Sequence, residues 1–437
     1  MSGFSRLEQR LPELLDELAG TRTPAYLSDI LARTAGLRQR PAWTISERWR
    51  PMTAITTPVA RLAPAPWRVV GLLALLLAIL LIGSLLAAGA HPHLPAPFGP
   101  AANGRIAYGA NGDIYTVDPS AGMPTVVATG PEIDTDPVWS RDGRSLIFKR
   151  TDPSFMGPGW LYLVHADGTG LTRLTPNLMA DISGYAMAPD GREALIVGVP
   201  AGVAQAYTVL SIALNDGSAI RTLDVGMAVL EAAYLPPDGS RVVFLGVGAT
   251  GVSPQREGLY EINRDGTGLR AIVAPSPTSH VGRWSLSPDG TRLAYTRWDS
   301  TSDGNTQQQH VINLDGTGDQ VVPLDPAWAW GGAVWSNDGS RLLVFGLPTA
   351  SGDGPFHAVI APIDGSQQPT VELAGPSGST NGFYQAEWAP DDRSILMSLS
   401  DAAGAPLGQF LWDADGETVR SVAWNASSAP SWQRLAP

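Results

Sequence analysis

The chain of 437 residues contains no cysteine, and this absence removes several kinds of chemistry. Without thiols the protein has no disulfide, no thiolate metal site and no cysteine nucleophile. Histidine is scarce as well, and none of the six histidines stands in the H-E-x-x-H pattern of zinc hydrolases. A chain of this composition suits an exported protein that folds without oxidative help.

Other sequence signatures of catalysis are also missing. The stretch Gly375–Ser379 comes nearest to a G-x-S-x-G nucleophile elbow but lacks the final glycine. No P-loop and no G-x-G-x-x-G follows a predicted strand. The pair His91 and His93 has no third ligand nearby, and Asp413–Glu417 lacks the later ligands of a calcium loop. We therefore expect a protein that is not an enzyme and that has no cofactor and no metal site.

Basic residues are in the minority over most of the chain. Residues 69–437 carry 19 basic and 35 acidic residues, whereas residues 1–68 carry ten arginines and six acids. Proteins that bind nucleic acids need basic surfaces to neutralise phosphates. The excess of acidic over basic residues in 69–437 therefore predicts that the protein has no nucleic-acid partner.

One long apolar run is present, Val69–Ala90, and its 22 residues carry no charge. At about 1.5 Å per residue a helix of this length covers about 33 Å, enough for a bilayer core of about 30 Å. Arginines crowd its N-terminal flank, whereas His91–Asn103 has no lysine or arginine. The positive-inside rule then predicts a single-pass protein of the cytoplasmic membrane with a cytosolic N-terminus and an extracytoplasmic C-terminal part. A cleaved signal peptide is the rival interpretation, but its apolar run would be shorter and nearer the N-terminus.

The sequence divides into five predicted segments. They are a cytosolic helical segment (1–57), a Pro/Arg juxtamembrane linker (58–68), the transmembrane helix (69–90), a Pro-rich linker (91–103) and a repeat region (104–437). Helical spacing of apolar residues, ended by Gly20 and Gly36, predicts two short helices at the start. Residues 1–66 are either a weakly helical tail or a docking element for a cytosolic partner.

The repeat region returns to one phrase about every fifty residues, which predicts a propeller or another repeat array. The phrase is a large apolar residue, one or two small or proline residues, an Asp-Gly turn and a β-rich run. Its aspartates are Asp142, Asp190, Asp238, Asp289, Asp338 and Asp391. A second Asp-Gly keeps the same period, at Asp167, Asp216, Asp265, Asp315, Asp364 and Asp415. Asp-Gly between apolar runs predicts hairpin turns, because glycine accepts the positive φ.

Two columns of the repeat are apolar throughout and predict the core between neighbouring blades. The first column, three residues before the aspartate, is Trp139, Met187, Leu235, Leu286, Trp335 and Trp388. The second, six residues after it, is Phe148, Ile196, Phe244, Tyr295, Val344 and Met397. The last stretch, Ser431–Leu435, supplies a first strand to a unit whose other strands begin near Arg105. Six full units plus this shared one predict an all-β, seven-bladed propeller of four-stranded blades, closed without an open edge.

The phrase resembles that of the TolB-like, WD-repeat-related β-propellers of bacterial envelope proteins. The W-S-x-D-G core and the strand that starts Leu161-Tyr162 or Leu259-Tyr260 carry the resemblance, which covers roughly 330 residues. It implies a propeller fold and a place in the cell envelope. The sequence departs from the pattern at Met187 and Leu235, and Asp392 replaces the glycine of the turn.

A pair of tryptophans, Trp328 and Trp330, falls outside the core columns. They lie in the stretch that enters the fifth unit, between Pro326 and Gly331. There they either face a ligand, as loops of propellers often do, or pack against the neighbouring blade. The longer inserts Thr151–Gly159 and Asp299–Gln309 are further candidates for binding loops.

These patterns favour a membrane-tethered, non-enzymatic binding module whose propeller contacts an envelope protein, a peptide or a glycan. Two alternatives stay open. The layout resembles that of membrane-bound anti-sigma regulators, in which residues 1–66 would hold a transcription factor. An enzyme could also use the central channel, if charged side chains converge there.

Overall fold

The structure is a computed structural model, and it describes most of the repeat region. The described residues are 99–120, 122–153, 159–175, 179–200, 208–248, 256–301, 304–348, 357–363, 371–374, 382–400, 406–416 and 418–435. No helix within these ranges is long and apolar enough to span a membrane. The predicted helices of residues 1–57 and the predicted span Val69–Ala90 lie outside them.

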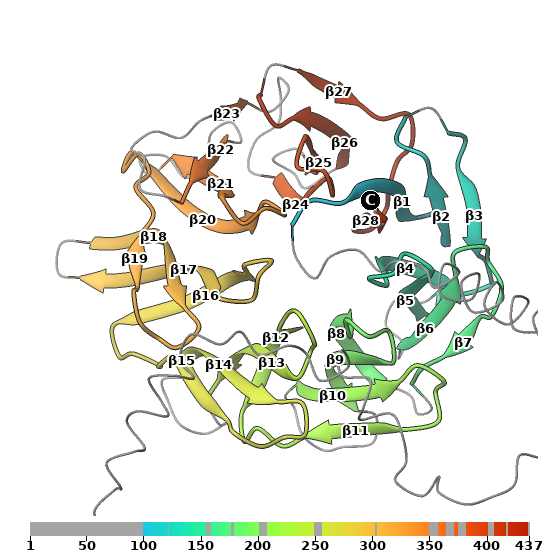
Figure 1. Cartoon of the computed structure of the whole chain (residues 1–437), viewed down its shortest axis with the longest axis horizontal. Coiled ribbons are helices and arrows are strands. Elements are labelled where there is room, and N and C mark those ends of the chain that lie inside the picture. Colours follow the sequence, from blue (N-terminus) through green and yellow to red (C-terminus); the bar gives the residue numbers. More distant parts are fainter. Residues whose placement is uncertain are drawn as a thin grey trace, which may run out of the picture. The chain divides into compact units, whose positions relative to one another are not determined.

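The described strands form a ring of antiparallel sheets, with one strand of each sheet near the centre and the last at the rim (Figure 1). Five sheets have four strands each. They are β28 (Ser431–Leu435), β1 (Ala102–Ala110), β2 (Asp113–Val117) and β3 (Thr125–Ala128); β12 (Ala228–Tyr234), β13 (Arg241–Val247), β14 (Glu257–Asn263) and β15 (Arg270–Val273); β16 (Ser279–Leu286), β17 (Arg292–Thr301), β18 (Gly304–Asn313) and β19 (Gln320–Val321); β20 (Trp328–Trp335), β21 (Arg341–Pro348), β22 (His357–Pro362) and β23 (Val371–Ala374); and β24 (Gly382–Trp388), β25 (Ser394–Ser400), β26 (Pro406–Asp413) and β27 (Val419–Ser421).

The sixth sheet has eight strands. They are β4 (Ile133–Trp139), β5 (Ser145–Thr151), β6 (Gly159–His165), β7 (Thr172–Arg173), β8 (Met179–Met187), β9 (Glu193–Pro200), β10 (Val209–Leu214) and β11 (Ile220–Leu223). The prediction of an all-β propeller with four-stranded blades is confirmed. The predicted count of seven separate blades is not confirmed. Two blades were expected in this part of the ring, but β6 pairs with β8 as well as with β7 and joins them into one sheet.

The Asp-Gly phrases build the tight turns of the ring through their side chains. In all six, the aspartate carboxylate accepts a hydrogen bond from the backbone N–H two residues later, over 2.9 to 3.1 Å. This Asx geometry mimics a backbone turn and explains why the residue is aspartate. The following glycine has φ between 66° and 69° in the first five phrases. In the sixth phrase Asp392 takes the same conformation, with φ 59°.

The second apolar column forms the deepest part of the core. All six of its members, from Phe148 to Met397, are completely buried. In the first column four members are buried, whereas Met187 and Leu286 are only partly so. Six of the seven core clusters combine side chains of adjacent sheets, and the seventh lies within the eight-stranded sheet, between its halves β4–β7 and β8–β11. The ring is therefore held by this side-chain packing.

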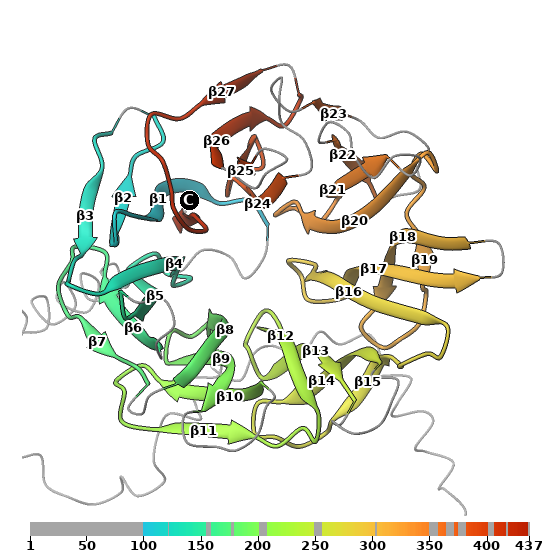
Figure 2. The same cartoon turned by 180° about the vertical axis from the view of Figure 1, so that it is seen from behind.

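The ring has two faces, which Figures 1 and 2 show from opposite sides. On one, which we call the turn face, five or six residues connect the first strand of a blade to the second. On the other, the hairpin face, the connection from second to third strand ranges from two residues to nine. Variable connections on a rigid scaffold are the usual place for binding sites. The hairpin face is therefore where a ligand site is expected.

The ring closes where β28 pairs with β1 in the four-stranded sheet β28–β1–β2–β3. Trp432 of β28 lies opposite Ile106 and is 5 % exposed. The described chain reaches this sheet across the turn face. There Gly99 N–H donates to the Asn337 carbonyl over 2.9 Å, and Arg434 donates to the Gly99 carbonyl over 2.6 Å. The turn-face mouth of the ring is thus crossed by chain.

Asp392, the departure from the repeated phrase, has a structural role of its own. Its carboxylate is buried and accepts three hydrogen bonds from the turn of the preceding blade. The donors are Asn337 N–H at 2.7 Å, the Asn337 amide at 2.8 Å and Asp338 N–H at 2.8 Å. The side chain therefore links two blades, which glycine could not do.

Replacing Asp392 by alanine should destabilise the ring by about 2–3 kcal/mol, because it leaves these donors without their charged acceptor. The Asp392→Gly variant restores the repeated phrase and relieves the positive φ, so we expect it to lose less stability than the alanine variant. Asp391→Ala, which removes only an exposed Asx bond, is the control. Chemical denaturation of the three variants measures the difference, and equal stability of Asp392→Ala and wild type would refute the role.

Candidate ligand-binding pocket between two blades

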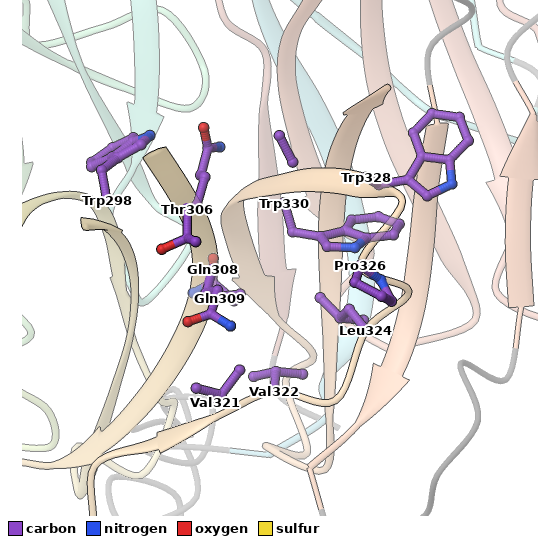
Figure 3. A pocket seen from close by; sticks show the side chains of 12 residues that line it. Trp298, Thr306, Gln308, Gln309, Val321, Val322, Leu324, Pro326, Trp328 and Trp330 are labelled. Carbon is purple, nitrogen blue, oxygen red and sulfur yellow. The ribbon is translucent and has the colours of Figure 1, made fainter. Parts of the chain in front are cut away.

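A pocket of about 490 Å³ lies on the hairpin face, where the blade β16–β19 meets the blade β20–β23. Its volume is within the range of roughly 300–1,000 Å³ typical of small-molecule sites. Figure 3 shows Trp298 on one side, Trp328 and Trp330 on the other, and Thr306, Gln308 and Gln309 between them. Among the residues that the structure describes, the lining consists of tryptophan, glutamine, threonine, proline and aliphatic side chains, and none of these is ionisable.

Trp330 serves both the core and the pocket. It is 4 % exposed and packs in the cluster of Trp335 and Leu342. Its indole N–H donates to the Asp325 carbonyl over 2.7 Å. Its ring lies over Gly346, the cross-strand partner, where a Cβ would come within 2.7 Å of the indole. Glycine at this position therefore lets the ring lie flat on the sheet.

Trp328 is half-buried and more accessible than its neighbour. Its ring stacks on the imidazole of His357, with ring centroids 4.1 Å apart and planes 15° apart. Trp330 stands 6.1 Å away at 40°, so the two indole rings form one wall of the pocket, and the imidazole backs Trp328 from outside the lining. The structure thus brings both predicted tryptophans to a cavity. Their contact with a ligand stays a prediction.

Trp298 was not predicted from the sequence, whereas Gln307, Gln308 and Gln309 fall within the insert Asp299–Gln309, which was a candidate for a binding loop. The insert Asp299–Gln309 was expected as a loop, but it forms the ends of β17 and β18, which pair as far as Thr301 and Gly304. This expectation was wrong because the polar residues of the insert continue a regular hairpin. Trp298 is half-buried and lies close to Gly282, where a Cβ would meet the indole at 3.1 Å. A tryptophan near the end of a long hairpin was the available signal.

The glutamines of β18 differ in exposure. Gln308 is exposed, Gln307 is half-buried and Gln309 is 1 % exposed. With the part of the chain that the structure describes, the Gln309 side chain makes only long contacts of 3.4 Å, to the Thr296 hydroxyl and to the carbonyl of His310. These distances are at the outer limit of hydrogen bonding. Its amide is therefore weakly engaged within the protein.

The next repeat but one offers a direct comparison. Gln409 occupies in its blade the position that Gln309 has in the blade β16–β19. In each blade the backbone carbonyl of this glutamine accepts a hydrogen bond from the N–H of the valine that directly follows the outermost strand, Val422 and Val322 respectively. The Gln409 side chain binds the backbone of Ala426 twice, at 2.9 and 3.2 Å. The pocket beside it holds about 290 Å³ and contains no tryptophan. The fold itself therefore does not require the aromatic wall.

A polar group formed by the buried Tyr295 and His310 and the more exposed Asp319 supports the pocket from within the blade β16–β19. Asp319 receives the Tyr295 hydroxyl at 3.0 Å and lies 3.0 Å from His310 Nδ1. Burial opposes ionisation of Asp319, but the hydrogen bond and charge of His310 outweigh it and lower the pKa of the carboxyl. Burial and this carboxylate raise the pKa of Tyr295. The group ties β17, β18 and β19 together, which fixes the strand that carries the glutamines.

A second cavity of about 400 Å³ lies among the inner strands. It is lined by Lys149, Tyr185 and Glu387, among others. The Tyr185 hydroxyl is held by backbone groups, including Lys149 N–H at 3.1 Å. Glu387 is half-buried and accepts the Trp432 N–H at 2.9 Å, and burial raises the pKa of its carboxyl to about 7. Within the described ranges, no three histidines, aspartates or glutamates come together as a metal site.

The raised pKa of Glu387 predicts a pH-dependent stability. The folded protein holds this proton more tightly than the unfolded chain, whose carboxyl titrates near 4.5. The contribution of the protonated Glu387 carboxyl to the free energy of unfolding is therefore full below about pH 4.5 and is lost as the pH rises to about 7. Its upper limit is roughly 3 kcal/mol. We expect Glu387→Gln to be more stable than wild type at pH 8 and similar to it at pH 4. Denaturation at both values tests this, with the exposed Asp181→Asn as control; equal pH profiles of wild type and Glu387→Gln would contradict it.

Comparison with known proteins supports the fold. No protein-family model and no curated protein matches the chain. Among solved structures, oligogalacturonate lyase from Vibrio parahaemolyticus matches with TM-score 0.55 and 12 % identity, over 75 % of this chain and 88 % of the lyase. A prolyl endopeptidase matches with TM-score 0.56 and 12 % identity, over 74 % of this chain and 49 % of its own. TolB from Acinetobacter baumannii matches with TM-score 0.43 and 14 % identity, over 78 % and 68 %.

At these identities the likeness shows the fold alone. The chain is a β-propeller of four-stranded blades. It spans about half the length of the prolyl endopeptidase. The TM-score of the TolB match is too low to support an argument, and the matched structures include enzymes.

Proposed function

We propose that this protein is a membrane-anchored, extracytoplasmic β-propeller that acts as a non-enzymatic binding module. One observation carries the proposal: the described residues that line the pocket on the hairpin face offer aromatic and amide side chains, with no ionisable group among them. Such a lining recognises a ligand by stacking and hydrogen bonding, whereas acid–base or nucleophilic catalysis needs a titratable or activated group. The pocket is therefore the ligand site of the module.

The architecture that we propose for the ring has seven blades. The eight-stranded sheet then counts as two blades, β4–β7 and β8–β11, which a single residue pair joins, Gly159 with Met179. Each half has its own pair of Asp-Gly turns, as the other blades have. The closing sheet β28–β1–β2–β3 is the seventh blade.

The membrane anchor in this proposal is Val69–Ala90, on the strength of its length, apolar character and flanking charges. Gly99 lies on the turn face, bonded to Asn337 and Arg434. The pocket opens on the hairpin face, away from this entry point.

The absence of cysteine allows a direct test of the membrane orientation. A single cysteine placed at the exposed Thr169 is the only thiol of that variant, and Ser5→Cys is its cytosolic counterpart. In intact cells a membrane-impermeant maleimide should label Thr169→Cys once the outer barrier is permeabilised, and should label Ser5→Cys only after lysis. Labelling of Ser5→Cys first, or of both equally, would overturn the proposed topology.

The binding role is tested by photo-crosslinking in native membranes. A photoreactive residue at the exposed Gln308 of the full-length chain should capture an envelope component. The same residue at Thr169, remote from the pocket, should not. A capture confined to a probe within residues 1–66 would instead favour signalling to a cytosolic regulator, and no capture at Gln308 would refute binding at the pocket.

A further inference from the structure

We infer that the pocket between β16–β19 and β20–β23 binds a neutral oligosaccharide, a short run of pyranose rings without charged groups. The inference rests on the proposed binding role and names the ligand class of that site. It follows from the orientation of the indole rings, from the chemistry of the amides and from the absence of charge.

The tryptophan rings are oriented before any ligand arrives. Trp298 lies close to Gly282, Trp330 lies over Gly346, and Trp328 is backed by the imidazole of His357. Each ring therefore rests against a fixed surface of the protein. The face of an indole carries partial negative charge and attracts the polarised C–H bonds on the apolar face of a pyranose. A rigid wall of this kind binds sugars with little loss of side-chain entropy.

The amides supply the complementary polar contacts. Gln308 is exposed and Gln307 is half-buried in the same stretch of β18. Each amide offers both donors and acceptors, and a sugar hydroxyl is likewise donor and acceptor at once. An anionic sugar would find no cation among the lining residues. The site thus fits hydroxyl groups rather than carboxylates or phosphates.

A proline-rich peptide is the nearest competitor, because such peptides also dock on aromatic grooves. A proline offers its carbonyl as acceptor and has no N–H to donate. The groove must then supply donors, and the Trp330 N–H is already bound to the Asp325 carbonyl. The other donors of the described lining are the amides, two indole N–H groups and the Thr306 hydroxyl, and a proline-rich peptide would use none of the amide oxygens as acceptors. A polyhydroxylated ligand satisfies both halves of each amide.

The corresponding pocket beside Gln409 shows what the repeat provides without this specialisation. There the backbone of Ala426 forms the hydrogen bonds of the glutamine, and the described lining consists of glutamine, serine, leucine and alanine. Folding of a blade pair therefore needs neither the tryptophan wall nor a weakly engaged glutamine. These features are additions to the fold, which supports their use in binding.

The test is isothermal titration calorimetry on the full-length protein in lipid nanodiscs, since maltoside and glucoside detergents would present the same chemistry as the ligand. The probes are maltotriose, cellotriose and triacetylchitotriose. Trigalacturonate and decaproline are the comparison ligands. We expect at least one neutral trisaccharide to bind more tightly than either comparison ligand.

Three variants locate the binding. Trp328→Ala should weaken it at least about tenfold, as expected when a stacking surface is lost. Gln308→Ala should weaken it severalfold, and its exposed position on a strand keeps the fold intact. Trp160→Ala removes a half-buried tryptophan outside the pocket and should leave the affinity unchanged. Retained affinity in both pocket variants would overturn the inference.

The outcomes separate this inference from the proposed function. Binding of decaproline or trigalacturonate in place of the neutral sugars, or failure of all three sugars, overturns the saccharide assignment. If photo-crosslinking at Gln308 then captures a protein, the binding role survives without the sugar. If neither sugar binding nor capture occurs, both proposals fail.

Discussion

Replacing Trp432 by alanine is expected to lower the free energy of unfolding of the ring by about 3–5 kcal/mol, the usual cost of removing a buried tryptophan. The indole is 5 % exposed and packs in one cluster with Ile106 of the closing sheet, Trp424 of the connection from β27 to β28, and Leu396 and Leu411 of the preceding blade. The substitution therefore opens a cavity at the place where the ends of the chain meet. A shift of the denaturation midpoint, with an unchanged dependence on denaturant, measures the effect.

The matched control is Leu435→Ala in the same strand. Leu435 is 37 % exposed, so its truncation should cost less than about 1 kcal/mol. Removal of residues 429–437 deletes β28 altogether, exposes the edge of β1 and should destabilise the ring more than either substitution. Unchanged stability of the truncated chain would show that closure through β28 does not hold the ring together.

The second large effect is expected at the buried ion pair of Asp134 and Arg150. The guanidinium binds the carboxylate in a two-point contact, at 2.6 and 2.7 Å. The Asp134 side chain is completely buried and that of Arg150 is 7 % exposed. Asp134→Ala leaves a buried cation without its partner and should cost about 3–5 kcal/mol.

Two comparisons show whether the cost comes from the unpaired charge. Asp181→Ala removes the partner of Lys149, which lies 3.6 Å away, and the Asp181 side chain is 58 % exposed. That loss should stay below about 1 kcal/mol. The double variant Asp134→Leu with Arg150→Met removes both charges and should recover most of the stability, since apolar replacements of a buried pair are often near neutral. A double variant as unstable as Asp134→Ala would mean that the pair itself, not the orphaned arginine, provides the stability.

The periodic parts of the fold could be predicted from the sequence because they repeat. The Asp-Gly turns recur with one geometry, and the column from Phe148 to Met397 is buried in every repeat. The number of separate sheets could not be predicted in the same way. The contact of Gly159 with Met179 depends on how two neighbouring blades approach, and no periodic residue marks it.

The pocket could be predicted only in part, because it is where the repeat is broken. Trp328 and Trp330 stand outside the core columns, and this irregularity singled them out. Trp298 lies at the end of a hairpin whose length the sequence did not reveal, since its polar residues are also typical of loops. Sequence spacing likewise could not show that Gly282 and Gly346 lie beneath indole rings, because this depends on the register of paired strands.

The entry of the chain at the turn face has a mechanical consequence. A pull on the chain ahead of Gly99 is transmitted first to the hydrogen bonds of Gly99 with Asn337 and Arg434 and to that of the Ala101 N–H with the Pro390 carbonyl, before it reaches β1. β1 is paired on both sides, with β28 and β2, so it resists a load along its length through many hydrogen bonds in parallel. We therefore expect the few contacts ahead of β1 to break before the strand pairing does. The blades, and the pocket between them, would keep their register under such a load.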